Sequence, residues 1–270
     1  MATYIAEHVS IDPRAEIADD VAIGPFCVIG PQVRIGSGTR LENHVTLLGN
    51  VTLGRFNRIY PNVVIGGEPQ DLSYRGSDTR VVIGDYNTIR EGVTINRATE
   101  KEDGVTSIGD HNYLMACSHV AHDCKLDNQI IIANGTLLGG HVHVQDYASL
   151  SGGVVVHHYA TIGAYSFVAG LSRVLHDAPP FMLVDGHPTR PRCINVVALK
   201  RNNFSAAAID DLAEAHRLLY RAKVGLEHAR EILHGNNKIH PHVVELLSFV
   251  QQQQAGKHGR GRERIRRAAA

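Results

Sequence analysis

The chain carries an aliphatic residue at every sixth position over most of its length. This register holds in three runs, from Ile5 to Ile65, from Ile83 to Ile95 and from Ile108 to Val174. Within the six-residue units the fifth position is usually small or β-branched, and the second is often glycine. The 3.6-residue period of an amphipathic helix is absent. The pattern predicts a repeat in which each unit is one short strand followed by a bend, with the second-position glycine permitting the bend.

Three such units make a triangular coil of 18 residues, and successive coils stack at the strand spacing of about 4.8 Å. The predicted fold is therefore mainly β, a parallel β-helix over residues 1–190. Two polar stretches, 68–82 and 96–107, interrupt the register and are expected to leave the solenoid as loops. Loops of this kind often carry functional contacts, because a rigid scaffold holds them.

The six-residue register ends near Pro179-Pro180, and helical signals follow it. Residues 191–255 are expected to form a small helical domain that caps the open end of the solenoid. The expected helices begin after Ser205 and run through Tyr220 until Gly225, then span about Leu226 to Leu233, and then begin near Pro241. Residues 256–270 are rich in lysine and arginine and are expected to be a solvated, disordered tail.

The amino-acid composition of the chain limits the kinds of binding partner and the cellular compartment that we expect. The formal net charge is zero, so strong attraction to nucleic acid or to an anionic membrane is not expected. The N-terminus has no basic and apolar secretory pattern, and no apolar run approaches the roughly 20 residues of a membrane helix. The four cysteines form no C-x-x-C pair, and we expect reduced thiols in a cytoplasmic protein without stable membrane insertion.

The 17 histidines matter through their spacing more than through their number. Units that start 18 residues apart lie on the same face of consecutive coils. Several histidines occupy outward positions of four such units, so they are expected on one external ridge, with neighbours within roughly 5 to 8 Å. These residues are His122, His141, His157, His158 and His176.

Three interpretations of this ridge remain open. It could be a solvated polar column, a metal site, or a general-base site. A metal site needs ligands that converge on one point, whereas a ridge is linear, so no metal is expected. In the third interpretation His122 takes a proton from a substrate hydroxyl and Asp123 orients its ring. The N–H of Gly140, one coil further along, would receive the developing oxyanion. The chain has no G-x-S-x-G, P-loop or dinucleotide motif, and no cofactor is expected.

Several short motifs resemble a known family. These are Ile23-Gly-Pro-Phe-Cys-Val-Ile-Gly-Pro31, Pro69-Gln-Asp-Leu72, His119-Val-Ala-His-Asp-Cys124, Gly139-Gly-His141, Asp177-Ala-Pro-Pro180, Asn195 and Leu199-Lys-Arg201. Together with the repeats they resemble the hexapeptide-repeat acyltransferases, and within them the enzymes that acylate UDP-N-acetylglucosamine in the first step of lipid A biosynthesis. The resemblance extends over about Ile5 to Phe249.

The resemblance implies a left-handed β-helix, an exception to the usual right-handed crossover. It also implies a homotrimer with sites between subunits. The donor would be an (R)-3-hydroxyacyl chain on acyl carrier protein, and the acceptor the 3-hydroxyl of the UDP-sugar. The implied roles are catalysis by His122, Asp123 and Gly140, substrate binding by Asp71, His119, His141, His157 and Asn195, control of acyl length by Gly170 beside Phe167, and contact with the carrier protein by Lys200 and Arg201.

The chain departs from the family pattern at four positions. Ser73 stands where a substrate-binding lysine is common, and His158 stands where the family has glutamine; both are candidate substrate contacts here. Val197 and Asn202 replace a glutamate and an arginine of the nucleotide site. These changes leave open an acceptor with a 3-amino group. Two further functions stay open, namely N-acyl transfer to UDP-3-O-acylglucosamine and the role of a non-catalytic hexapeptide-repeat protein, whether a scaffold or a metalloprotein resembling carbonic anhydrase.

Overall fold

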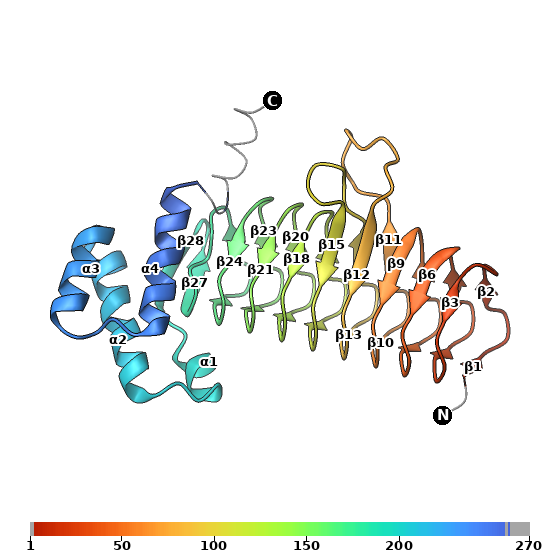
Figure 1. Cartoon of the computed structure of the whole chain (residues 1–270), viewed down its shortest axis with the longest axis horizontal. Coiled ribbons are helices and arrows are strands. Elements are labelled where there is room, and N and C mark those ends of the chain that lie inside the picture. Colours follow the sequence, from red (N-terminus) through yellow and green to blue (C-terminus); the bar gives the residue numbers. More distant parts are fainter. Residues whose placement is uncertain (1–2, 257–258, 260–270) are drawn as a thin grey trace.

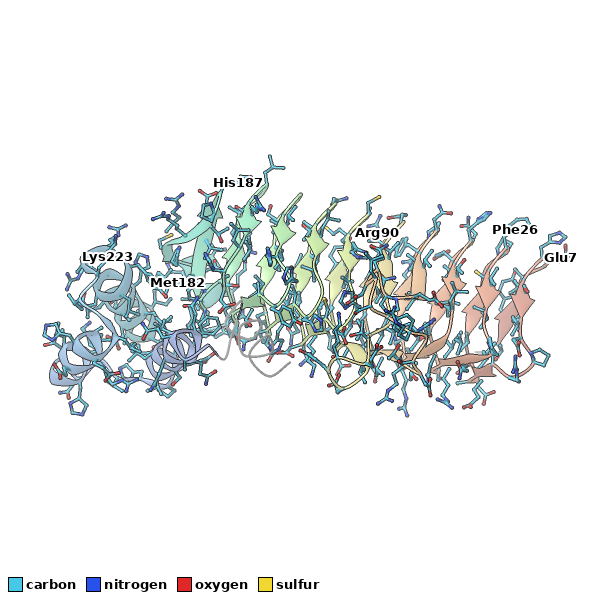
Figure 2. The ribbon with its side chains drawn as sticks, turned by 90° about the horizontal axis from the view of Figure 1, so that it is seen from above. Glu7, Phe26, Arg90, Met182, His187 and Lys223 are labelled. Atoms are coloured by element: carbon cyan, nitrogen blue, oxygen red, sulfur yellow. The ribbon has the colours of Figure 1, made fainter. Side chains whose placement is uncertain are left out.

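The structure, a computed structural model, describes residues 3–256 and 259. The molecule is elongated, with a solenoid of short strands along most of its length and helices gathered at one end (Figure 1). Viewed from above, Glu7 and Phe26 lie near one end of the molecule and Lys223 near the other (Figure 2). The basic tail expected over residues 256–270 lies outside the described residues, apart from Gly256 and Gly259.

The strands form three sheets, one along each face of the solenoid, and neighbours within each sheet come from successive coils. The first sheet contains β1 (Tyr4–Ile5), β4 (Ala22–Ile23), β7 (Arg40–Leu41), β10 (Arg58–Ile59), β13 (Thr88–Ile89), β16 (Tyr113–Leu114), β19 (Ile131–Ile132), β22 (Ser149–Leu150), β25 (Phe167–Val168), β27 (Met182–Gly186) and β28 (Thr189–Ile194). The second contains β2 (Ser10–Ile11), β5 (Val28–Ile29), β8 (Thr46–Leu47), β11 (Val64–Gly67), β14 (Thr94–Asn96), β17 (His119–Val120), β20 (Leu137–Leu138), β23 (Val155–Val156) and β26 (Arg173–Val174). The third contains β3 (Glu16–Ile17), β6 (Gln32–Ile35), β9 (Asn50–Leu53), β12 (Arg80–Ile83), β15 (Val105–Ile108), β18 (Lys125–Leu126), β21 (His143–Val144) and β24 (Thr161–Ile162).

The register confirms the six-residue pattern. Ile59 of β10 pairs in parallel with Ile89 of β13, and Val120 of β17 pairs with Leu138 of β20, so aliphatic residues stack directly on one another. Apart from the outermost coil, these anchors and the small residues at the fifth positions are buried. The stacked aliphatic columns form one continuous core, which holds the outward-facing residues on a fixed spacing.

The second-position glycines have a different role from the expected one. The bends are made at the fourth position, where non-glycine residues such as Asp123, His141 and Tyr159 have positive φ. The second-position glycines lie where coils touch. A Cβ atom on Gly36 would lie 2.5 Å from the carbonyl oxygen of Gly54 in the next coil. The prediction that glycine permits the bend is therefore wrong: second-position glycines such as Gly36 have no positive φ, and the absence of a side chain there allows the neighbouring coil to approach closely.

Two loops leave the solenoid at the corner between the second and third sheets. One connects β11 to β12 over residues 68–79, and the other connects β14 to β15 over residues 97–104. They lie next to each other above the middle of the solenoid (Figure 1). The turns from β17 to β18 and from β20 to β21 lie at the same corner in the following coils, so the loops lie close to His122 and Gly140.

The solenoid ends in an antiparallel hairpin of β27 and β28 that the sequence pattern did not predict, and the boundary expected near residue 190 falls inside β28. The helices that follow are α1 (Val196–Arg201), α2 (Ala206–His216), a π-helical segment (Arg217–Ala222), α3 (Leu226–Gly235) and α4 (Pro241–Gln254). Ser205 caps α2 as expected, since its Oγ accepts the Ala208 N–H at 3.1 Å. The short helix α1 was missed because six residues carry too little periodicity to be recognised.

Candidate active site

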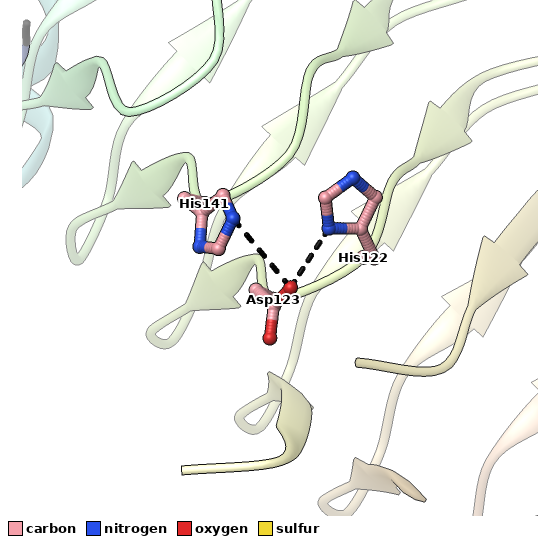
Figure 3. A group of neighbouring side chains, drawn as sticks. All are labelled: His122, Asp123 and His141. Atoms are coloured by element: carbon pink, nitrogen blue, oxygen red, sulfur yellow. Dashed lines mark hydrogen bonds and ion pairs between the residues drawn. The ribbon is translucent and has the colours of Figure 1, made fainter. Parts of the chain in front are cut away.

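His122 and Asp123 form a hydrogen-bonded pair at the turn after β17. The Nδ1 atom of His122 lies 2.7 Å from Oδ2 of Asp123 (Figure 3). The Asp123 side chain is 1% exposed and that of His122 is 13% exposed. Because Asp123 has positive φ at this turn, its side chain folds back beneath the adjacent histidine. A carboxylate on Nδ1 favours the tautomer in which Nδ1 carries the proton and Nε2 accepts one.

The carboxylate of Asp123 is held from the second loop. The backbone N–H of Thr99 donates to both of its oxygens at 3.1 and 3.2 Å, and the Thr99 hydroxyl donates to Oδ2 at 2.7 Å. Burial raises the pKa of Asp123, but the hydrogen bonds from His122 and Thr99 and the charge of His141 outweigh it and lower the pKa below the ordinary value. Asp123 therefore stays ionised at neutral pH beside His122.

His141 lies one coil further along and is not the outward-facing residue that the ridge predicts. It is 4% exposed, and its ring stacks on Tyr159 with 4.3 Å between centroids. Its Nε2 lies 3.6 Å from Oδ2 of Asp123 (Figure 3). Its Nδ1 lies 3.3 Å from Oε1 of Glu102. The second loop covers this part of the ridge, so the position of a residue within its six-residue unit did not determine its burial.

A pocket of about 320 Å³ opens beside the exposed edge of His122. Its wall is formed by Gln70 of the first loop and by residues of the second sheet and its turns, which include His119, His122, Gly139 and Gly140. A Cβ atom on Gly140 would lie 2.7 Å from Nε2 of His122, so that nitrogen lies against the Gly140 backbone. The Gly140 N–H makes no hydrogen bond within the described part of the chain. An acceptor and a free donor therefore lie together at this pocket.

His119 lines the same pocket one strand earlier. Its Nδ1 lies 2.7 Å from the Thr94 hydroxyl, which holds its ring on the outer face of the second sheet. Burial, and then the charge of nearby His122, lower the pKa of His119. His119 is therefore neutral at pH 7 and offers a hydrogen-bonding group to the pocket instead of a charge.

The predicted substrate contacts in the first loop lie together at its base. The carboxylate of Asp71 accepts the backbone N–H and the hydroxyl of Ser73 at 2.9 and 2.7 Å, and it also pairs with Lys101 of the second loop. Burial opposes ionisation of Asp71, but Lys101 and Ser73 hold its pKa well below the ordinary range. A lysine of the second loop, Lys101, therefore stands at this carboxylate.

His157 and His158 follow β23, one coil beyond Gly140. Their rings lie with centroids 3.8 Å apart, and Nδ1 of His157 lies 3.1 Å from the carbonyl oxygen of His158. His158 also makes an edge contact with Tyr159, at 5.6 Å between centroids, and Tyr159 in turn supports His141. Both histidines are half-buried. They line a continuation of the ridge but do not line the pocket beside His122.

The remaining predicted residues lie on another face. A larger cavity of about 660 Å³ runs along the first sheet to α1, and Phe167, Asn195 and Arg201 line it. The Asn195 side chain already has structural partners, since its Oδ1 caps α1 and its Nδ2 donates to the Tyr165 carbonyl oxygen at 2.9 Å. A Cβ atom on Gly170 would find ordinary contacts at 3.5 Å. One chain therefore carries the predicted residues on two separate faces.

The pair and His141 also have atoms close enough to hold a metal ion. One ligand atom from each of His122, Asp123 and His141 lies within 4.8 Å of the others. The expectation of a strictly linear ridge is wrong here, because both rings turn towards one carboxylate. Oδ2 of that carboxylate already accepts a hydrogen bond from the Thr99 hydroxyl and lies 2.7 Å from Nδ1 of His122.

The solenoid defines a hexapeptide-repeat protein, whose pocket holds a histidine paired with a buried carboxylate. Two family models match the chain, "Bacterial transferase hexapeptide (six repeats)" over residues 2–37 and "Udp N-acetylglucosamine O-acyltransferase; Domain 2" over residues 177–261. A protein of Stutzerimonas stutzeri named a UDP-N-acetylglucosamine O-acyltransferase is 43% identical over 91% of this chain and 95% of its own. The chain belongs to the UDP-N-acetylglucosamine O-acyltransferase family.

Solved structures agree with this assignment. The enzyme of Francisella novicida superposes with a TM-score of 0.86 at 39% identity, covering 90% of this chain and 89% of its own. That of Bacteroides fragilis gives a TM-score of 0.90 at 32% identity, covering 94% and 98%. The expected left-handed β-helix with its helical end is confirmed. None of the described helices has the length and apolar character to cross a membrane.

Sequence reasoning missed the residues of the second loop that contact the site. Thr99, Lys101 and Glu102 touch Asp123, Asp71 and His141 respectively. One feature of the sequence indicated that these loop residues lie near the site. The polar stretch 96–107 interrupts the register one coil before the pair, at the corner where His122 lies, so its residues had to be neighbours of the site.

Proposed function

We propose that this protein transfers an (R)-3-hydroxyacyl chain from acyl carrier protein to the 3-hydroxyl of UDP-N-acetylglucosamine, with His122 as general base. The observation that carries the proposal is the His122 ring, which is bound through Nδ1 to the ionised Asp123 while its Nε2 lies beside the free N–H of Gly140. The names of the matched relatives supply the substrates. The pocket supplies one base and one oxyanion donor, which this reaction requires.

The proposed reaction needs no protein nucleophile. Nε2 of His122 removes the proton of the sugar hydroxyl as its oxygen attacks the thioester carbonyl carbon. The resulting oxyanion accepts a hydrogen bond from the Gly140 N–H. When the intermediate collapses, the C–S bond breaks and His122 returns its proton to the departing thiolate. Asp123 stabilises the imidazolium that exists between the two transfers.

The donor is proposed to approach over the end of α1. Lys200 and Arg201 lie in its last turn, beside the larger cavity. An acidic carrier protein would be attracted to these cations, and the attraction would weaken with salt. A cytoplasmic location fits this donor, since Cys27, Cys117, Cys124 and Cys193 are all free thiols.

We also propose a homotrimer, supported by the unequal faces of the solenoid. The third sheet presents charged residues such as Arg34, Arg80 and Lys125, and none of the exposed large hydrophobic residues in the described part of the chain lies on its strands. The first sheet exposes Ile131, and the second exposes Leu137 and Val155. Two apolar faces that differ from each other suit a head-to-tail ring of subunits.

Such a ring would bring the two cavities together. The pocket beside His122 opens on the second sheet, and the larger cavity with Phe167 and Arg201 lies on the first. When the first sheet of one subunit packs on the second sheet of the next, each complete site takes His122 from one chain. It takes the end of α1, with Lys200 and Arg201, from the other chain. The separation of the predicted residues in one chain then has a simple reason.

Mixed trimers test this arrangement. A chain with His122→Ala and a chain with Arg201→Ala are each expected to be weak enzymes. When the two are unfolded together and reassembled, sites with His122 from one chain and Arg201 from the other reappear. Random mixing restores about a quarter of the wild-type sites in a cyclic trimer. Activity no greater than the average of the two separately refolded variants would contradict a shared site.

The function itself is tested with purified protein, UDP-N-acetylglucosamine and (R)-3-hydroxyacyl carrier proteins of graded length, followed by mass spectrometry of the product. The expected product is the sugar nucleotide acylated at oxygen. The 3-amino analogue is assayed in parallel, because a clear preference for it would replace the proposed acceptor. No transfer to either acceptor from any donor would overturn the proposal.

A further inference from the structure

Four consecutive residues of the second loop each contact a different residue of the site or of the first loop. Thr99 binds Asp123, Glu100 accepts the Ser77 hydroxyl at 3.0 Å, Lys101 pairs with Asp71, and Glu102 lies 3.3 Å from Nδ1 of His141. A loop with no role in the site would not direct four successive side chains to residues of the site and of the first loop. We propose that the segment Thr99–Glu102 positions the catalytic groups, and that Thr99 is the residue through which it orients Asp123 against His122.

The argument begins with the burial of Thr99. It is 0% exposed, although it belongs to a loop that projects from the solenoid. Its hydroxyl and its N–H supply three of the hydrogen bonds to Asp123. The solenoid holds the backbone of Asp123 through the N–H that donates to the Thr106 hydroxyl at 2.9 Å, and it places His122 and His141 beside Oδ2. The loop, through Thr99, supplies the remaining hydrogen bonds that fix the rotation of the carboxylate.

The oxygen that Thr99 holds is the one that His122 uses. Oδ2 of Asp123 receives both the Thr99 hydroxyl and Nδ1 of His122, each at 2.7 Å. Without the hydroxyl, Oδ2 loses one of its two hydrogen bonds of 2.7 Å and the carboxylate keeps only the longer bonds from the Thr99 N–H, so the partner of the His122 ring is held less firmly. Because a base must be aligned with the proton that it removes, the cost of this freedom should appear in kcat.

The segment also connects the first loop to the same carboxylate. Lys101 reaches Asp71, and its own N–H donates to the Thr99 hydroxyl oxygen at 3.2 Å. Glu102 holds the far side of His141, whose other ring nitrogen faces Asp123 at 3.6 Å. The first loop, His141 and the catalytic pair are thus joined through four residues that lie outside the repeat.

The test compares two substitutions of one buried side chain. Thr99→Val keeps the shape and the backbone N–H but removes the hydroxyl, and Thr99→Ser keeps the hydroxyl. Thr99→Val is expected to lower kcat about 10- to 100-fold with little change in KM for the acceptor, whereas Thr99→Ser keeps most of the activity. Equal activities of the two variants would overturn the proposal, because the hydroxyl would then have no role. Thermal unfolding of both variants checks that they fold.

This inference rests on the proposed function, and a second readout separates the two. Nitrogen NMR shifts of the His122 ring report its tautomer whether or not the protein turns over substrate. Thr99→Val is expected to shift the ring away from a single Nδ1–H tautomer, and Thr99→Ser to preserve it. If wild-type protein transfers no acyl group, the proposed function fails and the ring shifts still decide the role of Thr99. Unchanged shifts in Thr99→Val would contradict it.

Discussion

Replacing His122 with alanine is expected to lower kcat for acyl transfer by roughly 10²- to 10⁴-fold. The reason is that the pocket contains one imidazole whose Nδ1 is bound to an ionised carboxylate and whose Nε2 lies beside the free Gly140 N–H. Without it the sugar hydroxyl, a very weak acid, must attack while still protonated. KM for the acceptor should change little, because the lost group acts on the reacting proton. Initial rates with saturating donor measure both constants.

The chain offers a matched control for this substitution. His143 also pairs with an aspartate, since its Nε2 lies 3.0 Å from Asp127, but the pair lies on the third sheet and does not line the pocket. His143→Ala is therefore expected to have near wild-type kcat. If His122→Ala keeps more than a few per cent of the wild-type rate, or if both variants lose activity equally, His122 is not the base.

Replacing Gly140 with alanine is expected to have the second largest effect. The added Cβ atom would lie 2.5 Å from Cε1 and 2.7 Å from Nε2 of His122, distances that a real methyl group cannot occupy. The His122 ring must move, while the Gly140 N–H is retained. A displacement of about 1 Å at the reacting groups costs about 10²-fold in rate. The fall should again appear in kcat, with the fold preserved.

A second glycine-to-alanine change controls for the effect of the substitution itself. At Gly235, the last residue of α3, an added Cβ would meet no heavy atom of the described residues within 4 Å, apart from its chain neighbours and the backbone of its own helix. Gly235→Ala should therefore leave kcat unchanged, and both variants should unfold near the wild-type temperature. Full activity of Gly140→Ala would show that the ring does not need its present position, and it would remove Gly140 from the proposed mechanism.

The solenoid could be predicted from the sequence because its determinants are local and repeat. Each coil needs only an aliphatic residue and a small residue at fixed places, and stacking such as that of Ile59 on Ile89 reports directly on the period. The same arithmetic placed His122 next to Gly140, one coil away, because 18 residues along the chain are one coil along the axis. The solenoid and the closeness of His122 to Gly140 therefore followed from the spacing.

The repeat spacing could not predict the positions of the loop residues, because a polar segment outside the repeat has no period. The contact of Thr99 with Asp123, and the burial of His141 under Glu102, depend on how residues 97–104 fold back across the corner. The role of the second-position glycines was likewise decided by the approach of neighbouring coils, which a single coil does not reveal.

By itself, then, the sequence determined a β-helix with an outward His122 at a known distance from Gly140, since both follow from a strict repeat. Only the tertiary structure decided which groups hold the carboxylate of Asp123 against that histidine, since Thr99 comes from the irregular segment between β14 and β15. It also placed Phe167 and Arg201 on a different face from His122, because the three sheets of the solenoid face in different directions. A regular repeat specifies the scaffold, whereas non-local contacts of its interruptions specify how the base is held.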